Sequence, residues 1–70
     1  MKLRAAREAS GKTQARVARE VGISETSYQR IEYSKQVPKL RTAIRIARAL
    51  NTTVEKLFWD TYSNPVGKQG

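Results

Sequence analysis

A tight turn between two short amphipathic helices is the feature that most constrains this chain. Residues 13–32 have the sequence TQARVAREVGISETSYQRIE, with Gly22 near the middle. Thr13 and Ser24 belong to the residue types that cap a helix N-terminus with a side-chain oxygen. Glycine tolerates the left-handed backbone that ends many helices. The pattern therefore predicts a helix that begins after Thr13, a turn at Gly22 and a second helix that begins after Ser24.

Both predicted helices have one apolar face. Their apolar side chains recur at intervals of three and four residues, which is the spacing of a helix face that packs on a core. They are Ala15, Val17, Ala18, Val21, Tyr28 and Ile31. Ile23 stands just before the second cap, where a hydrophobic residue often fixes the entering chain. Two such helices joined by a short glycine turn form a helix-turn-helix.

The opposite face of the second helix is polar. Its side chains are of moderate length and carry hydrogen-bonding groups, a composition suited to contacts with the edges of DNA bases. They are Glu25, Thr26, Ser27, Gln29 and Arg30. This face is therefore the first candidate for a binding surface.

The charge balance indicates the same class of partner. The 14 Lys and Arg residues outnumber the 6 Asp and Glu residues, which gives a net charge of +8. Such an excess favours a polyanion, with nucleic acid as the first candidate. Net charge also keeps small domains soluble, so on charge alone a solvated surface without a partner stays open as the alternative.

The residue types that are missing argue against several classes of protein. The chain has no Cys and no His, so it lacks thiolate nucleophiles, disulfides, Cys-bound zinc and the commonest general base. Its carboxylates stand singly, without catalytic or metal-ligand spacing. We therefore expect no enzyme, no cofactor, no metal and no small-molecule ligand. No apolar run approaches the roughly 20 residues of a membrane span, and the basic start lacks a signal-peptide core. A cytoplasmic protein with no membrane partner is expected.

One further helix is expected on each side of the motif. Residues 2–9 predict a first helix that ends at Ser10 and Gly11, and Pro38, in the polar loop 34–39, can open a fourth helix. That fourth helix combines a buried apolar stripe with a basic one. The apolar positions are Leu40, Ala43, Ile44, Ile46, Ala47 and Leu50, and the basic positions are Arg41, Arg45 and Arg48.

A last short helix completes the expected fold. Asn51 can take a left-handed conformation, Thr52 or Thr53 can cap the helix, and Val54, Leu57 and Phe58 can supply its apolar face. Seventy residues allow one small domain. We therefore expect an all-α fold, a compact bundle of five short helices over residues 1–62, followed by a flexible tail over residues 63–70. The start at Met1 and the end at Gly70 favour a complete small protein.

Several segments together resemble a known family. They are Thr13-Gln14, the run GIS at 22–24, the triplet Arg30-Ile31-Glu32, Pro38 with Leu40, IRIARALN at 44–51 and VEKLF at 54–58. From Leu3 to Phe58 the chain resembles the phage-repressor type of helix-turn-helix, the Cro and C1 or Xre-like family of transcriptional regulators. The resemblance implies a lambda-repressor-like domain whose second motif helix, from Ser24 to about Tyr33, lies in the major groove of double-stranded DNA.

The resemblance also implies the residues that contact DNA. The base contacts are expected from Glu25, Thr26, Ser27 and Arg30, with Arg30 placed to bond guanine O6 and N7. Glu25 can accept from cytosine N4, yet phosphates repel it, and it can instead pair with Gln14 or Arg30. The backbone contacts are expected from Thr13, Gln14, Lys35, Lys39 and Arg41. Gln14 is further expected to support Glu25.

Two other sets of residues have structural roles by the same resemblance. Arg7 and Glu32 stand where the family often has a half-buried ion pair between the first helix and the end of the recognition helix. One recognition helix covers too few base pairs for selective binding, so a homodimer on an inverted repeat is expected. Its contact is expected from Leu57, Phe58, Trp59 and Tyr62. For Trp59 and Tyr62, closure of the core is an equal alternative.

The sequence therefore predicts a sequence-specific DNA-binding transcriptional regulator, most simply a repressor. Two alternatives use the same fold. One is an antitoxin or another protein-interaction module, whose main role is to bind a partner protein. The other is a nonspecific nucleic-acid-binding protein, in which Lys and Arg bind phosphates and the recognition helix discriminates no sequence.

Overall fold

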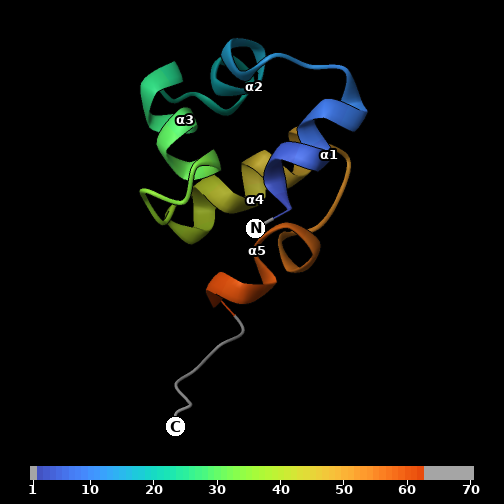
Figure 1. Cartoon of the computed structure of the whole chain (residues 1–70), viewed down its shortest axis with the longest axis vertical. Helices are drawn as coiled ribbons and strands as arrows, with labels where there is room; N and C mark the ends of the chain where they lie inside the picture. The colour runs from blue at the N-terminus through green and yellow to red at the C-terminus, as the bar shows by residue number, and fades with distance from the viewer. Residues whose placement is uncertain (1, 63–70) are drawn as a thin grey trace, which may run out of the picture.

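Five α-helices make up the part of the chain that the computed structural model describes, residues 2–62 apart from the side chain at position 60 (Figure 1). They are α1 (Leu3–Ser10), α2 (Gln14–Val21), α3 (Glu25–Glu32), α4 (Leu40–Ala49) and α5 (Val54–Tyr62). No strand occurs among the described residues. The expected all-α bundle of five helices is confirmed, whereas the tail predicted at 63–70 lies outside the described residues.

The predicted caps define the helix-turn-helix formed by α2 and α3. The Thr13 hydroxyl accepts a hydrogen bond from the Arg16 backbone N–H at 3.0 Å, and the Ser24 hydroxyl accepts one from the Ser27 N–H at 3.0 Å. Gly22 ends α2 with φ 89° and ψ 29°, in the left-handed region. Because a side chain is strained there, glycine suits this turn. The local chemistry therefore sets where both helices begin and where the first one ends.

The ends of α4 and α5 follow the sequence prediction with one difference. Asn51 is left-handed (φ 59°), as predicted. Of the two predicted caps, Thr53 caps α5 by accepting from the Lys56 N–H at 3.2 Å. Pro38 does not open α4, which begins two residues later. Pro38 is instead buried in the loop between α3 and α4.

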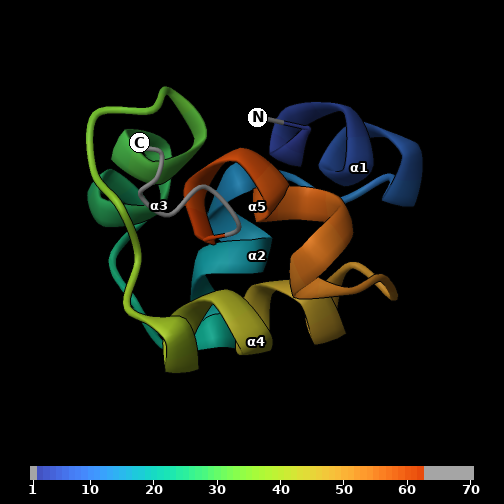
Figure 2. The ribbon, with the colours of Figure 1, turned by 90° about the horizontal axis from the view of Figure 1, so that it is seen from below.

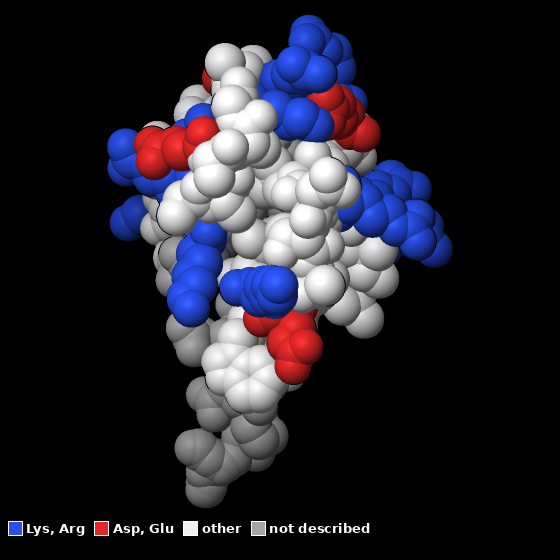
Figure 3. All heavy atoms as spheres, turned by 90° about the vertical axis from the view of Figure 1, so that its right-hand side faces the viewer, with Lys and Arg blue, Asp and Glu red and all other residues white. Residues whose placement is uncertain are grey.

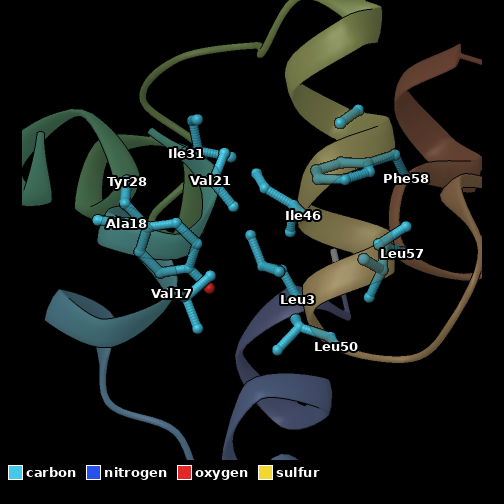
Figure 4. Close-up of a cluster of buried hydrophobic side chains, with 12 residues drawn as sticks. Leu3, Val17, Ala18, Val21, Tyr28, Ile31, Ile46, Leu50, Leu57 and Phe58 are labelled. Carbon is cyan, nitrogen blue, oxygen red and sulfur yellow. The ribbon is translucent and has the colours of Figure 1, made fainter. Parts of the chain in front are cut away.

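The core lies between α4 and the other helices. Figure 2 shows α4 along one side of the molecule, with α2 and α5 against it. In Figure 4, Leu57 and Phe58 point from α5 toward Ile46 of α4, and the side chains of α2 and α3 lie beyond. The buried apolar residues are Leu3, Val17, Ala18, Val21, Tyr28, Ile31, Ala43, Ile46, Ala47, Leu50, Leu57 and Phe58.

Three residues of the predicted apolar faces are exposed. Leu40 is 56% exposed, Ile44 is 38% exposed, and Ala15 is also on the surface. Successive residues of a helix are about 100° apart, so Leu40 and Ile44 lie at the edge of the buried stripe that centres on Ala43 and Leu50. Their apolar surface is left exposed. Within the described residues, no helix is long and apolar enough to cross a lipid bilayer.

Candidate nucleic-acid interface

The outer face of α3 is the candidate surface for contacts with DNA bases, and we call it the reading face. Tyr28 is fully buried and Ile31 nearly so, and these two side chains fix α3 against the core. Glu25, Thr26 and Arg30 consequently lie exposed on the opposite side. Ser27 and Gln29 are half-buried. In Figure 1, α3 lies at one edge of the molecule with nothing covering its outer side.

A buried ion pair joins α1 to the last residue of α3. The Arg7 guanidinium donates to both oxygens of Glu32, from Nε to Oε2 at 2.8 Å and from Nη2 to Oε1 at 3.1 Å. The Glu32 side chain is fully buried, and that of Arg7 is 13% exposed. The structure thus brings together the two residues that the family resemblance pairs. A bidentate contact of this kind fixes orientation as well as distance.

The pair changes the acidity of its members. Burial would raise the pKa of Glu32, but hydrogen bonds, led by those from Arg7, outweigh burial and hold that pKa below its ordinary value. The same hydrogen bond to Glu32 raises the pKa of Arg7. Burial also raises the pKa of the neighbouring Tyr28, and the nearby carboxylate of Glu32 adds to this effect. The Tyr28 hydroxyl has no partner within hydrogen-bond distance among the described residues.

Gln14, the first residue of α2, is oriented by the same carboxylate. Its amide nitrogen donates to Glu32 Oε1 at 3.0 Å, and its amide oxygen accepts from Gln29 Nε2 at 3.3 Å. Gln29 also donates to Glu25 Oε2 at 3.3 Å. The expected support of Glu25 by Gln14 is thus indirect, because Gln29 lies between them. Glu25 is bonded to Gln29 rather than to Gln14 or Arg30.

Gln29 was counted in the polar face of α3, but it is the one residue of that face that was not among the expected DNA contacts, and its bridging role was not predicted. Its spacing of four residues from Glu25 was a usable signal, since side chains at i and i+4 meet on a helix surface. The second contact, to Gln14 on the neighbouring helix, depends on how α2 packs on α3. No pattern within one helix reveals it.

Several basic side chains near α2 are engaged within the protein. Lys12 Nζ donates to Glu20 Oε1 and to the Ala49 carbonyl, both at 2.8 Å, while the Lys12 carbonyl accepts from Arg7. Arg16 pairs with the other oxygen of Glu20 at 2.9 Å. Hydrogen bonds from Lys12 and Arg16 lower the pKa of Glu20. These groups hold the loop between α1 and α2 in place, and less of their charge is available to a polyanion.

Other basic residues are exposed and make no ion pair among residues 2–62. Lys35 and Lys39 flank the loop after α3, and Arg41 lies in the first turn of α4. Thr13 uses its hydroxyl oxygen as a helix cap, and the first N–H groups of α2 beside it have no partner within the helix. Figure 3 shows the side away from α3, where basic side chains also gather in separate groups. Positive charge is therefore not confined to the reading face.

The expected dimer residues divide into two pairs. Leu57 and Phe58 are buried in the core of the single chain, so they cannot supply the predicted contact surface. Trp59 (57% exposed) and Tyr62 (39% exposed) lie on the surface. Phe58 has non-helical angles (φ −125°, ψ 28°), so α5 bends there. Of the four expected dimer residues, only the exposed outer pair, Trp59 and Tyr62, can contribute to a contact between subunits.

Tyr62 connects α5 to the loop that follows α3. Its hydroxyl donates to the Pro38 carbonyl, and its ring meets Phe58 edge to face, with centroids 6.0 Å apart. A shallow apolar hollow of about 220 Å³ lies beside it, lined by Val54, Glu55, Phe58, Trp59 and Tyr62. Tyr62 therefore borders the loop that carries Lys35 and Lys39.

Comparison with known proteins agrees with this geometry. Residues 3–57 match the model of a helix-turn-helix family of the Cro/C1 type. The chain belongs to this family. Its members are DNA-binding transcriptional regulators rather than enzymes, and the matched residues span all of α1 to α4 and the start of α5.

Two relatives in this helix-turn-helix family are similar along most of the chain. One is the cryptic phage CTXphi transcriptional repressor RstR of Vibrio cholerae serotype O1, 40% identical over 60 residues that cover 83% of this chain and 54% of RstR. The other is an uncharacterized HTH-type transcriptional regulator of Archaeoglobus fulgidus, 37% identical over 57 residues, or 81% of each chain. The chain thus spans about half the length of RstR. No solved structure was found to match it.

Proposed function

We propose that this chain is a sequence-specific DNA-binding repressor that occupies an inverted-repeat operator as a homodimer. The observation that carries the proposal is the anchoring of α3. Tyr28, Ile31 and the buried Glu32 fix one side of this helix, and a row of hydrogen-bonding side chains stands on the other. A rigid helix with a polar outer face is what recognition in the major groove requires.

Arg30 is the leading residue for specificity in this proposal. It is exposed in the last turn of α3, and the structure gives it no ion pair among the described residues. A guanidinium can donate two parallel hydrogen bonds to guanine O6 and N7. Thr26 and Ser27 lie nearer the start of the helix, where they would contact neighbouring bases. Glu25 would accept a hydrogen bond from cytosine N4.

Contacts to the sugar-phosphate backbone would hold α3 in register. Lys35, Lys39 and Arg41 lie exposed just beyond the recognition helix and make no ion pair within the described part of the chain. The N-terminus of α2 next to Thr13 offers backbone N–H groups and the positive end of a helix dipole. In this proposal Gln14 acts through Glu32 and Gln29 rather than as the main phosphate ligand, since both its polar atoms are already bonded.

The homodimer is supported by an apolar surface and by geometry. Trp59 and Tyr62 are exposed, as are the large apolar side chains of Val37, Leu40 and Ile44 in the preceding loop and α4, and Tyr62 contacts that loop at the Pro38 carbonyl. A second copy is the occupant we propose, because two-fold pairing would cover this surface and set two recognition helices about one DNA turn, roughly 34 Å, apart. Two chains of charge +8 repel elsewhere, so an uncharged contact suits their association.

The proposal of repression rather than activation rests on the relative RstR. RstR is named a transcriptional repressor and is 40% identical over the aligned residues. A domain that occupies an operator blocks polymerase without further machinery, so repression is the simplest outcome of tight binding. In this proposal the protein acts in the cytoplasm, where the DNA that a bacterial or phage regulator binds is found.

The proposal is tested by selecting duplexes from a randomised pool at near-physiological salt and sequencing the bound fraction. We expect one inverted repeat, preferred over scrambled DNA by about a thousandfold or more and bound by two chains. The variant Arg30→Gln should lose the preference at one base pair of each half-site, whereas Arg48→Gln on α4 should keep it. Binding without enrichment that fades as salt rises would instead identify a nonspecific phosphate-binding surface.

A further inference from the structure

The buried carboxylate of Glu32 determines how the side-chain amides above it are oriented. A carboxylate only accepts hydrogen bonds, so Gln14 must direct its NH₂ group to Glu32. The oxygen of Gln14 is then left to accept, and it does so from the NH₂ group of Gln29. The second hydrogen of that NH₂ group serves Glu25, whose carboxylate also only accepts. Each donor and acceptor in this row is therefore assigned by chemistry.

The row connects the interior of the domain to the start of the recognition helix. It begins at Arg7 and Glu32, where the carboxylate is fully buried, and ends at Glu25, which is exposed. Gln29 is half-buried and bridges two helices, since its amide bonds Gln14 on α2 and Glu25 on α3. Hydrogen-bonded rows of this kind restrict the rotamers of all their members.

We propose that Gln29 is a positioning residue that sets the specificity of this domain through Glu25. It holds the Glu25 carboxylate one turn away as a hydrogen-bond acceptor for the amino group of a base, cytosine N4 in the first place. Gln29 itself makes no base contact in this role. The inference rests on the proposed function, because it concerns which bases the outer face of α3 selects.

Glu25 needs such support because of its charge. Phosphates on both sides of the major groove repel a carboxylate, and a free glutamate on a helix surface has many rotamers that point away from the bases. The hydrogen bond from Gln29 opposes both effects, since it is directional and links Glu25 to the fixed Gln14 and Glu32. The pre-set carboxylate rejects bases that present acceptors, such as guanine O6 and N7.

The test uses the whole chain and the best operator from the selection experiment. Glu25→Ala first identifies the base pair of each half-site whose preference depends on Glu25. Gln29→Met then removes the amide but keeps the length and helix propensity of the side chain. Gln36→Met, at an exposed glutamine of the loop between α3 and α4, is the matched control. The double variant Glu25→Ala with Gln29→Met closes a double-mutant cycle.

We expect Gln29→Met to weaken the preference at the Glu25-dependent base pair by about fivefold. The double variant should show no loss of preference beyond that of Glu25→Ala alone. Affinity for scrambled DNA, its salt dependence and the midpoint of thermal unfolding should match those of the wild type and of Gln36→Met. An unchanged preference in Gln29→Met would overturn the inference while the proposed function stands. An equal loss on all duplexes, or a lowered unfolding midpoint, would show a merely structural role and overturn it too. A wild type without sequence preference would overturn both proposals.

Discussion

α3 and α5 border the same core but are held there by different chemistry. α3 is fixed by Tyr28 together with hydrogen bonds that run from Arg7 through Glu32 to Gln14. α5 is fixed in the core by Leu57 and Phe58, whose buried side chains are wholly apolar, and a hydrogen bond from Tyr62 joins only its last residue to the loop after α3. Apolar burial is non-directional and sets how deep a helix lies, whereas hydrogen bonds also set its rotation and side-chain orientation.

The difference matches what each helix would contact. Bases are distinguished by the positions of single donors and acceptors, so α3 needs a fixed rotation. An apolar contact between two subunits tolerates small adjustments of side chains such as Trp59 and Leu40. If this distinction holds, substitutions in the two regions should differ in kind as well as in size.

The largest effect is expected at Phe58. Phe58→Ala removes a fully buried aromatic ring and should lower the free energy of unfolding by about 3 to 5 kcal/mol, a large part of the stability of a domain of this size. Denaturant titration followed by far-UV circular dichroism measures it. Trp59→Ala, one residue along, is the matched control and should change unfolding little while weakening pairing of subunits on the operator. Equal destabilisation by both would refute the division of α5 into a core side and a contact side.

A smaller loss is expected at Glu32. Glu32→Gln leaves the Arg7 charge without its partner, and we expect a loss of about 2 to 3 kcal/mol in the free energy of unfolding. This loss lies at or below the usual loss when one partner of a fully buried ion pair is removed, because Arg7 keeps some contact with water. Glu8→Gln, in the exposed Arg4 to Glu8 pair, should cost little. Thermal unfolding of the two variants compares them directly, and equal midpoints would count against the importance of burial.

The fold could be predicted further from the sequence than the site could. The caps at Thr13 and Ser24 and the turns at Gly22 and Asn51 depend on neighbouring residues only, and all four were predicted. Helical periodicity shows which side chains share a face, but it does not show what covers that face. For this reason Leu40 was expected inside and is exposed.

The same limit explains the errors at α5 and in the reading face. Leu57 and Phe58 were expected both on the apolar face of the last helix and at a contact between subunits, and their burial in the core of the single chain agrees only with the first. The bridging role of Gln29 depends on its distance to Gln14 across two helices. A family resemblance transfers Gln14 as a support for Glu25, but it carries no information about a residue that this chain places between them.

The smallest effect is a dependence on pH that only the polar region should show. The pKa of Glu32 is below its ordinary value of 4.5 in the folded chain, so folding favours the ionised carboxylate. Its stabilising effect is complete well above pH 4.5 and is lost as the pH falls through the lowered pKa, while Arg7 and Tyr28 do not titrate there. The stability difference between the wild type and Glu32→Gln should therefore shrink below about pH 4.

Denaturant titrations at several pH values between about 3 and 7 measure this difference, and a second variant tests its origin. Phe58→Leu alters only apolar packing, so its stability difference from the wild type should stay constant over the same range. If the Glu32→Gln difference also stayed constant, Glu32 would not be stabilised in its ionised form, and the directional anchoring of α3 would lose its electrostatic basis. If both differences changed in parallel, a general effect of acid on the folded domain would be responsible. A change confined to Glu32→Gln would locate the pH-sensitive anchor in the network that orients α3 and leave α5 dependent on apolar burial.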